Sequence, residues 1–465
     1  MSLLSERYAS QAMKDIWSAH AKILAERNLW ITVMKTQAAL GFDVPAQAIT
    51  DYEKVKNQID LVSIDKREKE LRHDVKARIE EFNALAGHQY IHIAMTSRDL
   101  TENIEALQIV SALKLIQTKT IATLARLSEK TAEYKALPIV GRSHNVPAQI
   151  TTLGKRFATV AEELLFAHSR LEHLMENFPI RGLKGPVGTA QDSHDIMAAN
   201  NKKLEAAIIE SLGFKNSLDS TGQIYPRSYD YEVLTSLVAL SAAPSNLATS
   251  IRLMAGNDLV SEGFKQGQVG SSAMPHKMNT RSCERINGFA AILKGYAVMI
   301  GEISGNQWNE GDVSDSVVRR VALADAFFAM DGLLETTLTV LNEFGIFPAM
   351  IEKEIRINLP LLATTKILMA AVKNGMGRED AHEAIKEIST KVATDIRNGK
   401  DSDLLKAIAE DSRIPLSHED LTKLSASPPE FAGLAQEQSD AVIAKISAIT
   451  KAHPEAASYQ PSSIR

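Results

Sequence analysis

The sequence predicts an all-α fold built around a long helical bundle. Apolar residues recur at the helical steps of four and three, as in Leu247, Ile251 and Met254. Alternating strand patterns are hard to find. Glycine and proline gather at the junctions between long uninterrupted segments, where helices end.

Five segments of roughly 25 to 30 residues exceed the average length of a globular helix. They span residues 110–135, 148–177, 229–257, 283–305 and 316–343. We expect a central bundle over 111–360, between an N-terminal helical domain over 1–110 and a C-terminal helical domain over 361–465. The sequence shows no fixed-period repeat that would indicate a solenoid. The polar tail from 454 to 465 is expected to be loose.

Charge and composition exclude several classes of partner. The 465 residues include 52 Lys and Arg against 57 Asp and Glu, which leaves a formal net charge of -5. No bulk basic field therefore attracts nucleic acid or an acidic membrane, and we expect neither as a partner. An anionic ligand must instead meet a local cluster of cations.

The sequence favours a cytoplasmic location. Its first residues lack the basic segment and apolar run of a secretion signal, and the lone Cys283 cannot form an internal disulfide. The uncharged stretch 233–251 is long enough to raise the question of a membrane span. Eight of its 19 positions are polar or proline, so we interpret it as a helix buried among other helices.

The most informative segment is 267–279, with the sequence GQVGSSAMPHKMN. Its glycines predict a mobile loop that presents hydroxyls, an ammonium group and an amide. Proton abstraction beside a carboxylate creates a doubly charged intermediate, so the base needs cationic and hydrogen-bonding neighbours. Ser271, Lys277 and Asn279 supply these groups. By composition alone, a surface loop without chemistry is the simpler interpretation.

The stretch GSSAMPHKMN resembles the signature loop of the fumarase and aspartase superfamily, Gly-Ser-Ser-x-Met-Pro-x-Lys-x-Asn. The resemblance implies that Ser271 is the general base and that Lys277 and Asn279 bind the carboxylate beside the carbanion. Ser272 and Met274 are implied as further substrate contacts. Thr280 replaces the usual proline, which removes no chemical group.

The segment 141–145, Gly-Arg-Ser-His-Asn, resembles the Gly-Arg-Thr-His-Gly segment of the same superfamily. The resemblance implies that His144 is the general acid on the leaving nitrogen, a role that suits a side chain titrating near neutrality. Glu284 stands 13 residues after Ser271, where the superfamily places the carboxylate that orients this histidine. Without the flanking match, a lone histidine is more often a structural or surface residue.

Three N-terminal segments, within 6–8, 72–75 and 92–97, resemble those with which adenylosuccinate lyases, one family of the superfamily, hold a nucleotide. The resemblance implies Arg7 and Tyr8 at the ribose phosphate and His73 as a second catalytic histidine near the reacting centre. It also implies Asp74 as a substrate contact, with His92, Thr96 and Ser97 along the substrate.

Two later segments agree with this family. Residues 223–227 resemble the segment whose glutamine contacts the succinyl carboxylate, which implies Gln223 and Arg227 as substrate contacts. Residues 312–320 resemble the segment that binds phosphate, which implies Ser316 and Arg320. Arg319 stands where relatives often have glutamate, a difference that we expect to affect mostly a helix surface.

Two other patterns are set aside. His88 and His92 stand four residues apart, but no third ligand follows at metal spacing. The glycine-rich run 182–189 lacks the spacing of a phosphate loop, and we interpret it as a tight connection. We therefore expect no metal and no cofactor.

The resemblance implies an anti elimination of fumarate from succinylated purine nucleotides: adenylosuccinate, giving AMP, and SAICAR, giving AICAR. It also implies a homotetramer whose core is formed by the bundles and whose active sites gather residues from three subunits. One alternative is argininosuccinate lyase or another fumarate-releasing lyase, whose substrate lacks the phosphate that Arg7 would bind. Another is a catalytically inactive relative, although Ser271 and His144 are both present.

Overall fold

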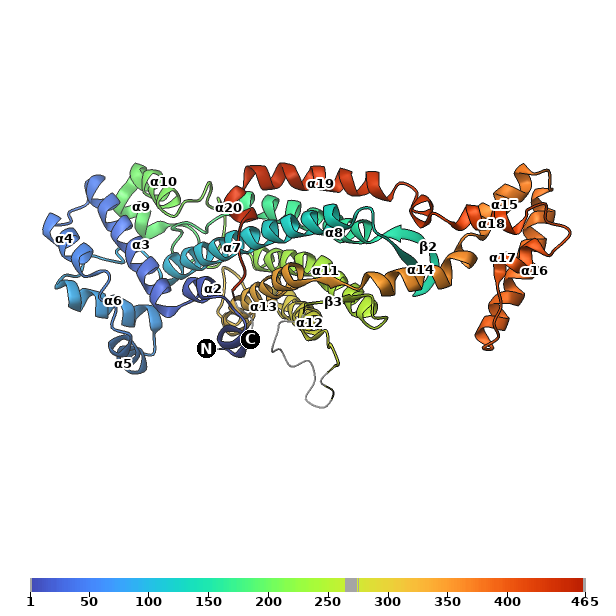
Figure 1. The fold of residues 1–465 in the computed structure, drawn as a ribbon. Coiled ribbons are helices and arrows are strands. Elements are labelled where there is room, and N and C mark those ends of the chain that lie inside the picture. The colour runs from blue at the N-terminus through green and yellow to red at the C-terminus, as the bar shows by residue number, and fades with distance from the viewer. Residues whose placement is uncertain (1, 264–273, 275, 463–465) are drawn as a thin grey trace.

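Five long helices lie side by side along the middle of the molecule in the computed structural model (Figure 1). They are α7 (Ser97–Tyr134), α8 (Leu153–Asn177), α11 (Ser228–Ala255), α12 (Arg281–Ile303) and α13 (Asp315–Glu343). The structure describes residues 2–263, 274 and 276–462. The predicted all-α class, with a long central bundle, is confirmed.

The first bundle helix, α7, begins at Ser97, well before the predicted position near 110. The Asp99 carboxylate accepts the N–H of Thr96 at 2.8 Å, which is half of the capping box that starts a helix. The apolar periodicity alone did not reveal this start, because the first turns of α7 bury polar side chains as well as apolar ones.

A β-hairpin precedes α8, so the prediction of helix from residue 148 was wrong. Strand β1 (Pro138–Ser143) pairs with β2 (Val146–Thr152) in antiparallel register. In β2 only Ile150 and Thr152 are buried, so its alternation of apolar and polar residues is weak. Helix α8 starts immediately after the hairpin, where the Thr152 side chain accepts the N–H of Lys155 at 3.1 Å.

The uncharged stretch 233–251 lies within α11, where its apolar side chains are largely buried, as predicted. Among the described residues, a different helix, α12, is long and apolar enough to cross a membrane by length and composition alone. Only 33% of that stretch is buried within one chain. Two later helices meet the same test only if they are joined across a 43° bend.

One end of the molecule is formed by α3 (Ala19–Ala39), α4 (Ala46–Val55), α5 (Leu61–Leu71) and α6 (Asp74–Ala86) (Figure 1). The two short helices before them, α1 (Leu3–Arg7) and α2 (Gln11–Ile16), contact the bundle helix α13. Three later elements are α9 (Gln191–Met197), the 3-10 turn η1 (Ala198–Asn200) and α10 (Asn201–Ser211), of which α10 packs against α3.

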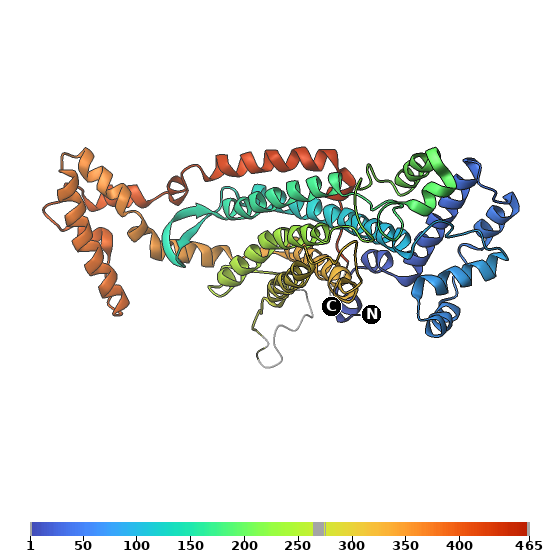
Figure 2. The same cartoon turned by 180° about the vertical axis from the view of Figure 1, so that it is seen from behind.

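The opposite end is formed by helices that share a separate apolar core (Figures 1 and 2). They are α15 (Thr364–Lys373), α16 (Arg378–Arg397), α17 (Leu404–Ala409) and α18 (His418–Ser425), followed by η2 (Pro428–Phe431). Helix α14 (Pro348–Leu362) leads to them and buries Ile351, Ile355 and Leu359 in the main core. Strands β3 (Val260–Ser261) and β4 (Gly345–Ile346) pair just before α14. Helix α19 (Ala435–Ala452) then returns along α7 and α8. The division at 110 and 360 stays a prediction.

The C-terminal tail is not loose within its described part, so that prediction was wrong. Helix α20 (Pro454–Ala457) packs on α7. Beyond it, the Tyr459 hydroxyl and the Ser462 N–H both donate to the buried carboxylate of Glu335 on α13. These bonds hold the tail, because the buried carboxylate of Glu335 requires hydrogen-bond partners.

Lys119 of α7 explains why this part of α13 can carry two buried carboxylates. Its side chain is fully buried and forms ion pairs with Asp331 and with Glu335, the latter at 2.6 Å. It also donates to the Ser10 hydroxyl at 3.1 Å. One ammonium group therefore joins α7, α13 and the N-terminal segment.

We predict that Lys119→Met strongly destabilises the protein. Two carboxylates would stay buried without their cation, a change that typically costs about 3 to 5 kcal/mol. The midpoint of urea unfolding should fall clearly. The control is Lys423→Met, which removes an exposed pair with Glu419 on α18 and should leave the midpoint unchanged. Equal midpoints for the two variants would contradict the prediction.

Candidate active site

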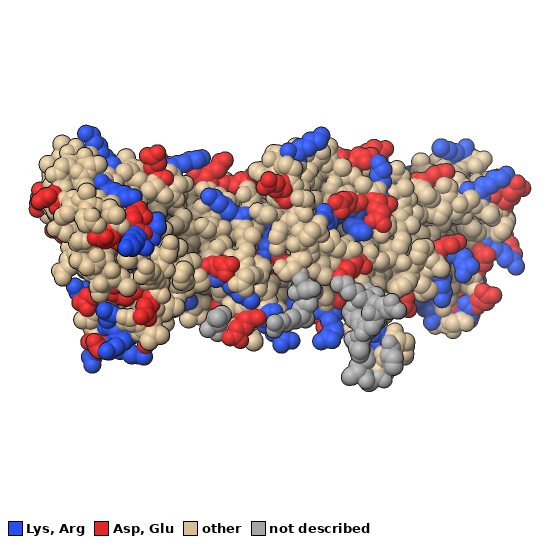
Figure 3. Space-filling model, turned by 60° about the vertical axis from the view of Figure 1, so that its left-hand side comes forward, with Lys and Arg blue, Asp and Glu red and all other residues tan. Residues whose placement is uncertain are grey.

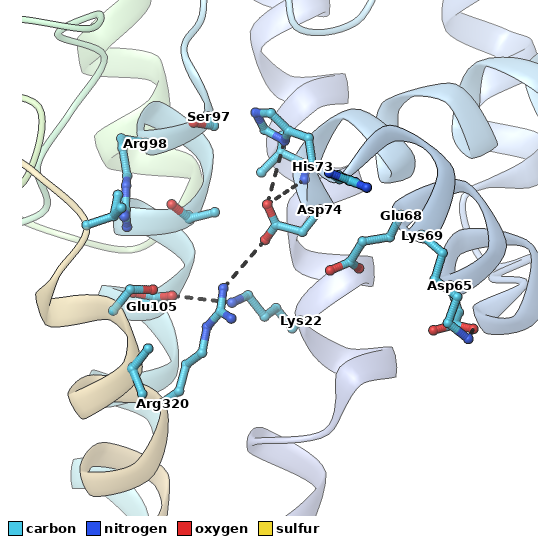
Figure 4. A pocket seen from close by; sticks show the side chains of 16 residues that line it. Lys22, Asp65, Glu68, Lys69, His73, Asp74, Ser97, Arg98, Glu105 and Arg320 are labelled. Carbon is cyan, nitrogen blue, oxygen red and sulfur yellow. Dashed lines mark hydrogen bonds and ion pairs between the residues drawn. The ribbon is translucent and has the colours of Figure 1, made fainter.

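The largest group of predicted residues lines a cavity of about 810 Å³ where α3, α5, α6, α7 and α13 meet (Figure 4). The predicted residues in its wall are His73, Asp74, Ser97, Ser316 and Arg320. Other charged side chains in its wall include Arg98 and three that the sequence analysis missed, Lys22, Lys69 and Glu105. The cavity offers both cations and carboxylates to a ligand.

His73 stands at the sharp connection between α5 and α6, as the N-cap residue of α6. Arg72 before it has a left-handed φ of 54°, which ends α5. The Nδ1 of His73 accepts the N–H of Lys76 at 3.3 Å, so this nitrogen carries no proton. The Asp74 carboxylate lies 3.7 Å from the same nitrogen, beyond hydrogen-bond length, so the cap bond decides the tautomer. The Nε2–H of His73 is therefore the group available to a ligand.

Ser316 and Arg320 stand one helical turn apart on the first turns of α13 and face the same cavity. The Arg320 side chain is 74% exposed, and its guanidinium lies 4.0 Å from the Asp74 carboxylate. Burial alone would raise the pKa of Asp74, but Arg78 and other neighbours hold it below its usual value. Asp74 is therefore ionised at neutral pH, and Arg320 keeps donors for a ligand.

Arg227, a predicted substrate contact, is instead used inside the protein. It is 4% exposed, and its guanidinium donates two hydrogen bonds of 2.9 Å to Glu102 of α7. It also pairs with Asp315 at the start of α13. These contacts favour a structural role, in which Arg227 holds the segment before α11 against two other helices.

The expectation that Arg319 affects mostly a helix surface was wrong. Arg319 is 4% exposed and donates to Asp230 at 2.8 Å and to Glu105 at 2.6 Å. It also donates to the Tyr225 hydroxyl at 2.6 Å. Arg319 therefore fixes the first turns of α13, and with them the position of the neighbouring Arg320.

Gln223 lies on a chain segment that is anchored through its backbone. Its N–H donates to the carbonyl of Glu310 at 2.6 Å, and Arg181 donates to the carbonyl of Gly222 at 2.9 Å. A Cβ on Gly222 would stand 2.0 Å from the Glu310 oxygen, so the close approach of the two segments requires glycine.

The predicted tight connection 182–189 folds onto the start of α7. The Asp99 carboxylate accepts the N–H groups of Lys184 at 2.8 Å and Gly185 at 3.1 Å. The predicted contacts His92 and Thr96 lie just before α7, partly buried, with Thr96 bonded to the same carboxylate.

Arg7 and Tyr8 line a separate cavity of about 180 Å³. The guanidinium groups of Arg7 and Arg285 lie 5.8 and 5.5 Å from the centre of the Tyr8 ring. Burial, and then the charge of Arg7, lower the pKa of Arg285, although Tyr8 offsets part of the effect. Glu6 and Glu335 line the same cavity, so it offers a ligand both cations and carboxylates. The sequence analysis missed Arg285, because no recognised motif includes it.

Lys277, Asn279 and Glu284 meet at a third cavity, of about 830 Å³, between the N-terminus of α12 and the start of α14. Glu284 is exposed in the first turn of α12, and Met274 is also exposed. The predicted base Ser271 and its neighbour Ser272 lie outside the described residues.

Glu262, which the sequence analysis did not single out, links the chain just before residue 264 to the start of α12. Its carboxylate accepts the N–H groups of Ser282 and Cys283, each at 2.9 Å, and so caps α12. Next to it, Gly263 has a φ of 107°, and a Cβ there would stand 2.4 Å from the Glu343 side chain. Burial raises the pKa of the Cys283 thiol, which is therefore unreactive at neutral pH.

His144 stands with Asn145 at the tip of the β1–β2 hairpin, exposed to solvent within one chain. Both residues have positive φ, 51° and 62°, as a type I′ turn requires. Arg142 steadies the tip, because its guanidinium donates to the Asn145 carbonyl at 3.3 Å and pairs with Glu354 of α14 at 2.5 Å. The turn, and not a helix, presents His144.

One chain does not bring these groups together. The hairpin with His144 and the cavity with His73 lie toward opposite ends of the long bundle (Figure 1). Arg7 and Arg320, which were both predicted to bind the same phosphate, also line two separate cavities. Within a single chain, the predicted site residues therefore form several partial sites.

We looked on the described residues for two other kinds of binding site, an extended charged patch and a metal site. Lys and Arg alternate with Asp and Glu over the face drawn in Figure 3, without an extended patch of one sign. Within residues 2–263, 274 and 276–462, no group of three or more His, Cys, Asp or Glu side chains could hold a metal ion.

Sequence comparisons connect the chain with one group of enzymes. A family described as "Lyase" matches residues 5–295, and one described as "Adenylosuccinate lyase C-terminus" matches residues 360–442. The adenylosuccinate lyase of Saccharomyces cerevisiae is 33% identical over 95% of this chain and 93% of its own. That of Archaeoglobus fulgidus is 26% identical over 96% and 98%.

Solved structures share the fold. A 3-carboxy-cis,cis-muconate lactonizing enzyme from Pseudomonas putida superposes with a TM-score of 0.84 at 18% identity, covering 96% of this chain and 99% of the other. A fumarate lyase from Mesorhizobium sp. BNC1 gives 0.81 at 19% identity, covering 94% and 98%. At this identity the likeness concerns the fold alone.

The hairpin geometry generates a prediction that is independent of activity. Glu354→Gln removes the ion pair with Arg142, so the tip should open more often. Amide hydrogen exchange at residues 143–146, followed by mass spectrometry, should become faster. Residues 138–140 and 150–152, at the base of the hairpin, are the internal control. Unchanged exchange at the tip would show that Glu354 does not hold it.

Proposed function

The chain belongs to the adenylosuccinate lyase family, and on this premise we propose that it releases fumarate from adenylosuccinate, giving AMP, and from SAICAR, giving AICAR. The observation that carries the proposal is the 33% identity to the Saccharomyces cerevisiae adenylosuccinate lyase over nearly the whole chain. The cavity with Ser316 and Arg320, and that with Arg7 and Arg285, support a phosphorylated substrate. Argininosuccinate carries no phosphate and would need neither.

In the proposed reaction, Ser271 as an alkoxide removes the proton from the succinyl carbon beside a carboxylate. Lys277 and Asn279 bind that carboxylate while its negative charge grows. His144 then protonates the nitrogen as the carbon–nitrogen bond breaks, and Glu284 orients His144. This chemistry requires no metal or cofactor.

The remaining predicted residues bind the substrate in this proposal. His73, with its proton on Nε2, donates near the reacting centre, while Arg7, Ser316 and Arg320 hold the phosphate. Other proposed contacts are Tyr8, Asp74, His92, Thr96, Ser97, Gln223, Ser272 and Met274. Arg227 contributes by fixing the segment that carries Gln223, since its own donors are engaged by Glu102 and Asp315.

We further propose a homotetramer in which each active site takes residues from three subunits. The separation of His144 from His73 along one bundle supports this, because neighbouring bundles can bring opposite ends together. Exposed apolar side chains on the bundle helices offer a surface for such packing: Tyr231, Leu253, Ile292, Val298, Val317 and Val321. The buried free thiol of Cys283 is consistent with the proposed cytoplasmic location.

The direct test is an assay of the purified protein with adenylosuccinate, following AMP and fumarate together. Equimolar formation of the two products is expected. Argininosuccinate in a parallel assay should give no fumarate. Turnover of argininosuccinate alone would replace the proposal with its alternative.

Subunit mixing tests the shared site. Ser271→Ala and His144→Ala should each be inactive, because one loses the base and the other the acid. After subunit exchange between the two, roughly a quarter of sites should hold both intact residues if these come from different subunits of a symmetric oligomer. Mixed oligomers that stay inactive would place both residues on the same chain. Each variant exchanged with itself is the control.

Arg320→Ala tests the phosphate contact. A charge-assisted contact is typically worth about 1.5 to 3 kcal/mol, so KM should rise by roughly one to two orders of magnitude with a smaller loss in kcat. The defect should nearly vanish with succinyladenosine, which lacks the phosphate. Arg378→Ala, an exposed arginine on α16, is the control and should behave as the wild type. Equal impairment on both substrates would show that Arg320 does not contact the phosphate.

A further inference from the structure

The indole of Trp30 on α3 decides which nitrogen of His92 carries the proton. The Trp30 Nε1–H donates to Nδ1 of His92 at 2.9 Å. An indole nitrogen can only donate, so Nδ1 must accept and must be unprotonated. The two rings stand edge to face, with centroids 5.9 Å apart and an interplanar angle of 82°. His92 is therefore neutral, with its proton on Nε2.

The position of the Trp30 ring is itself fixed. Trp30 is fully buried, and its ring stacks on Phe82 of α6 at 6.3 Å. A buried N–H without an acceptor would cost free energy, so the indole and the imidazole hold each other in place. The hydrogen bond consequently sets the orientation of the His92 ring as well as its tautomer.

A second side chain from the same helix holds the backbone next to His92. Gln37, seven residues after Trp30 and on the same face of α3, donates to the carbonyl of Ile93 at 3.2 Å. His92 and Ala94 both have left-handed φ values, 64° and 56°. Such a conformation is costly for residues other than glycine and persists where neighbours enforce it. Helix α3 therefore acts as a rigid support for this segment.

The electrostatic surroundings agree with a neutral imidazole. Burial lowers the pKa of His92 to about 4, and the charge of Asp99 opposes this only in part. His73 and Lys76 lower the pKa further. Because the pKa lies below the physiological range, His92 does not gain a proton between pH 6 and 8, and it cannot act as a cationic acid there.

We propose that Trp30 is a positioning residue that holds His92 as a neutral hydrogen-bond donor, with Nε2–H directed to the substrate, and that His92 is neither an acid nor a base in the reaction. The inference rests on the proposed function, in which His92 lies along the substrate. The acceptor on the substrate is an anionic oxygen of a carboxylate or phosphate, the group that a neutral N–H donor next to cationic residues can bind.

Three substitutions at His92 separate the donor role from an acid–base role. A Gln side chain places its N–H near the position of Nε2, whereas an Asn side chain reaches only to Nδ1. His92→Gln should therefore retain kcat/KM within about tenfold of the wild type, a loss of some 1.4 kcal/mol. His92→Asn and His92→Ala should both lose roughly a hundredfold or more. The pH profile of His92→Gln should keep both limbs of the wild-type profile.

Trp30→Phe tests whether the indole N–H positions His92. The ring remains but the N–H is lost, so kcat/KM should fall by roughly tenfold. In the His92→Gln background, Trp30→Phe should have little further effect, because no imidazole remains to be oriented. Phe82→Leu is the control for packing: it removes the ring that stacks on Trp30 but leaves the indole N–H and its hydrogen bond to His92, so it should lower stability and reduce kcat/KM less than Trp30→Phe does.

Each outcome decides a separate point. If His92→Gln is as inactive as His92→Ala and loses one limb of its pH profile, His92 is an acid or base and the proposal is wrong. If Trp30→Phe keeps full kcat/KM while His92→Ala is impaired, Trp30 does not position His92. If His92→Ala itself cleaves adenylosuccinate at the wild-type rate, His92 does not contact the substrate, and the lyase activity still stands.

Discussion

Two buried guanidinium groups, those of Arg227 and Arg319, connect the start of α13 and the segment before α11 to α7. Arg227 binds Glu102 through both terminal nitrogens, and Arg319 reaches Asp230 and Glu105. Breaking one member of such a cluster leaves a charge buried without a partner, so the helices can shift only together. The cavity with His73 and Arg320 depends on this, because part of its wall is formed by side chains of α7 and α13.

The same rigidity sets a limit on what one chain can do. Long helices keep the hairpin and the His73 cavity at a constant distance from each other. No rotation of side chains can bridge that distance. Chemistry that needs both ends must therefore join different copies of the chain, as the proposed tetramer does. The proposed tetramer also explains why apolar side chains are exposed on α11, α12 and α13 of a single chain. They would be buried against the bundle of another subunit.

The sequence predicted the fold class and the five long helices because apolar periodicity over 25 residues is a strong signal. It did not predict the hairpin, because only Ile150 and Thr152 of β2 are buried and the strand pattern is weak. It also did not predict the role of Arg319, because the sequence does not show whether an arginine is buried or exposed. Residues within recognised motifs, including His73 and Lys277, could be named as candidates from the sequence, and their roles stay predictions. Glu262, Arg285 and Trp30 were missed because their importance arises only from partners far along the chain.

The three candidate histidines share a structural feature that the motifs do not express. His73 caps a helix, and His92 and His144 adopt left-handed backbone conformations, so each stands where regular structure stops. An imidazole at such a point projects beyond its element, but the left-handed backbone of His92 and His144 costs of order 1 to 3 kcal/mol each and persists only where neighbours enforce it. The neighbours are specific: the Lys76 N–H for His73, Trp30 and Gln37 for the His92 segment, and Arg142 with Glu354 for the tip that carries His144. The helices thus provide contacts beside these bends as well as rigid supports, and they fix the His73 and His92 rings and the backbone that carries His144 before a substrate binds.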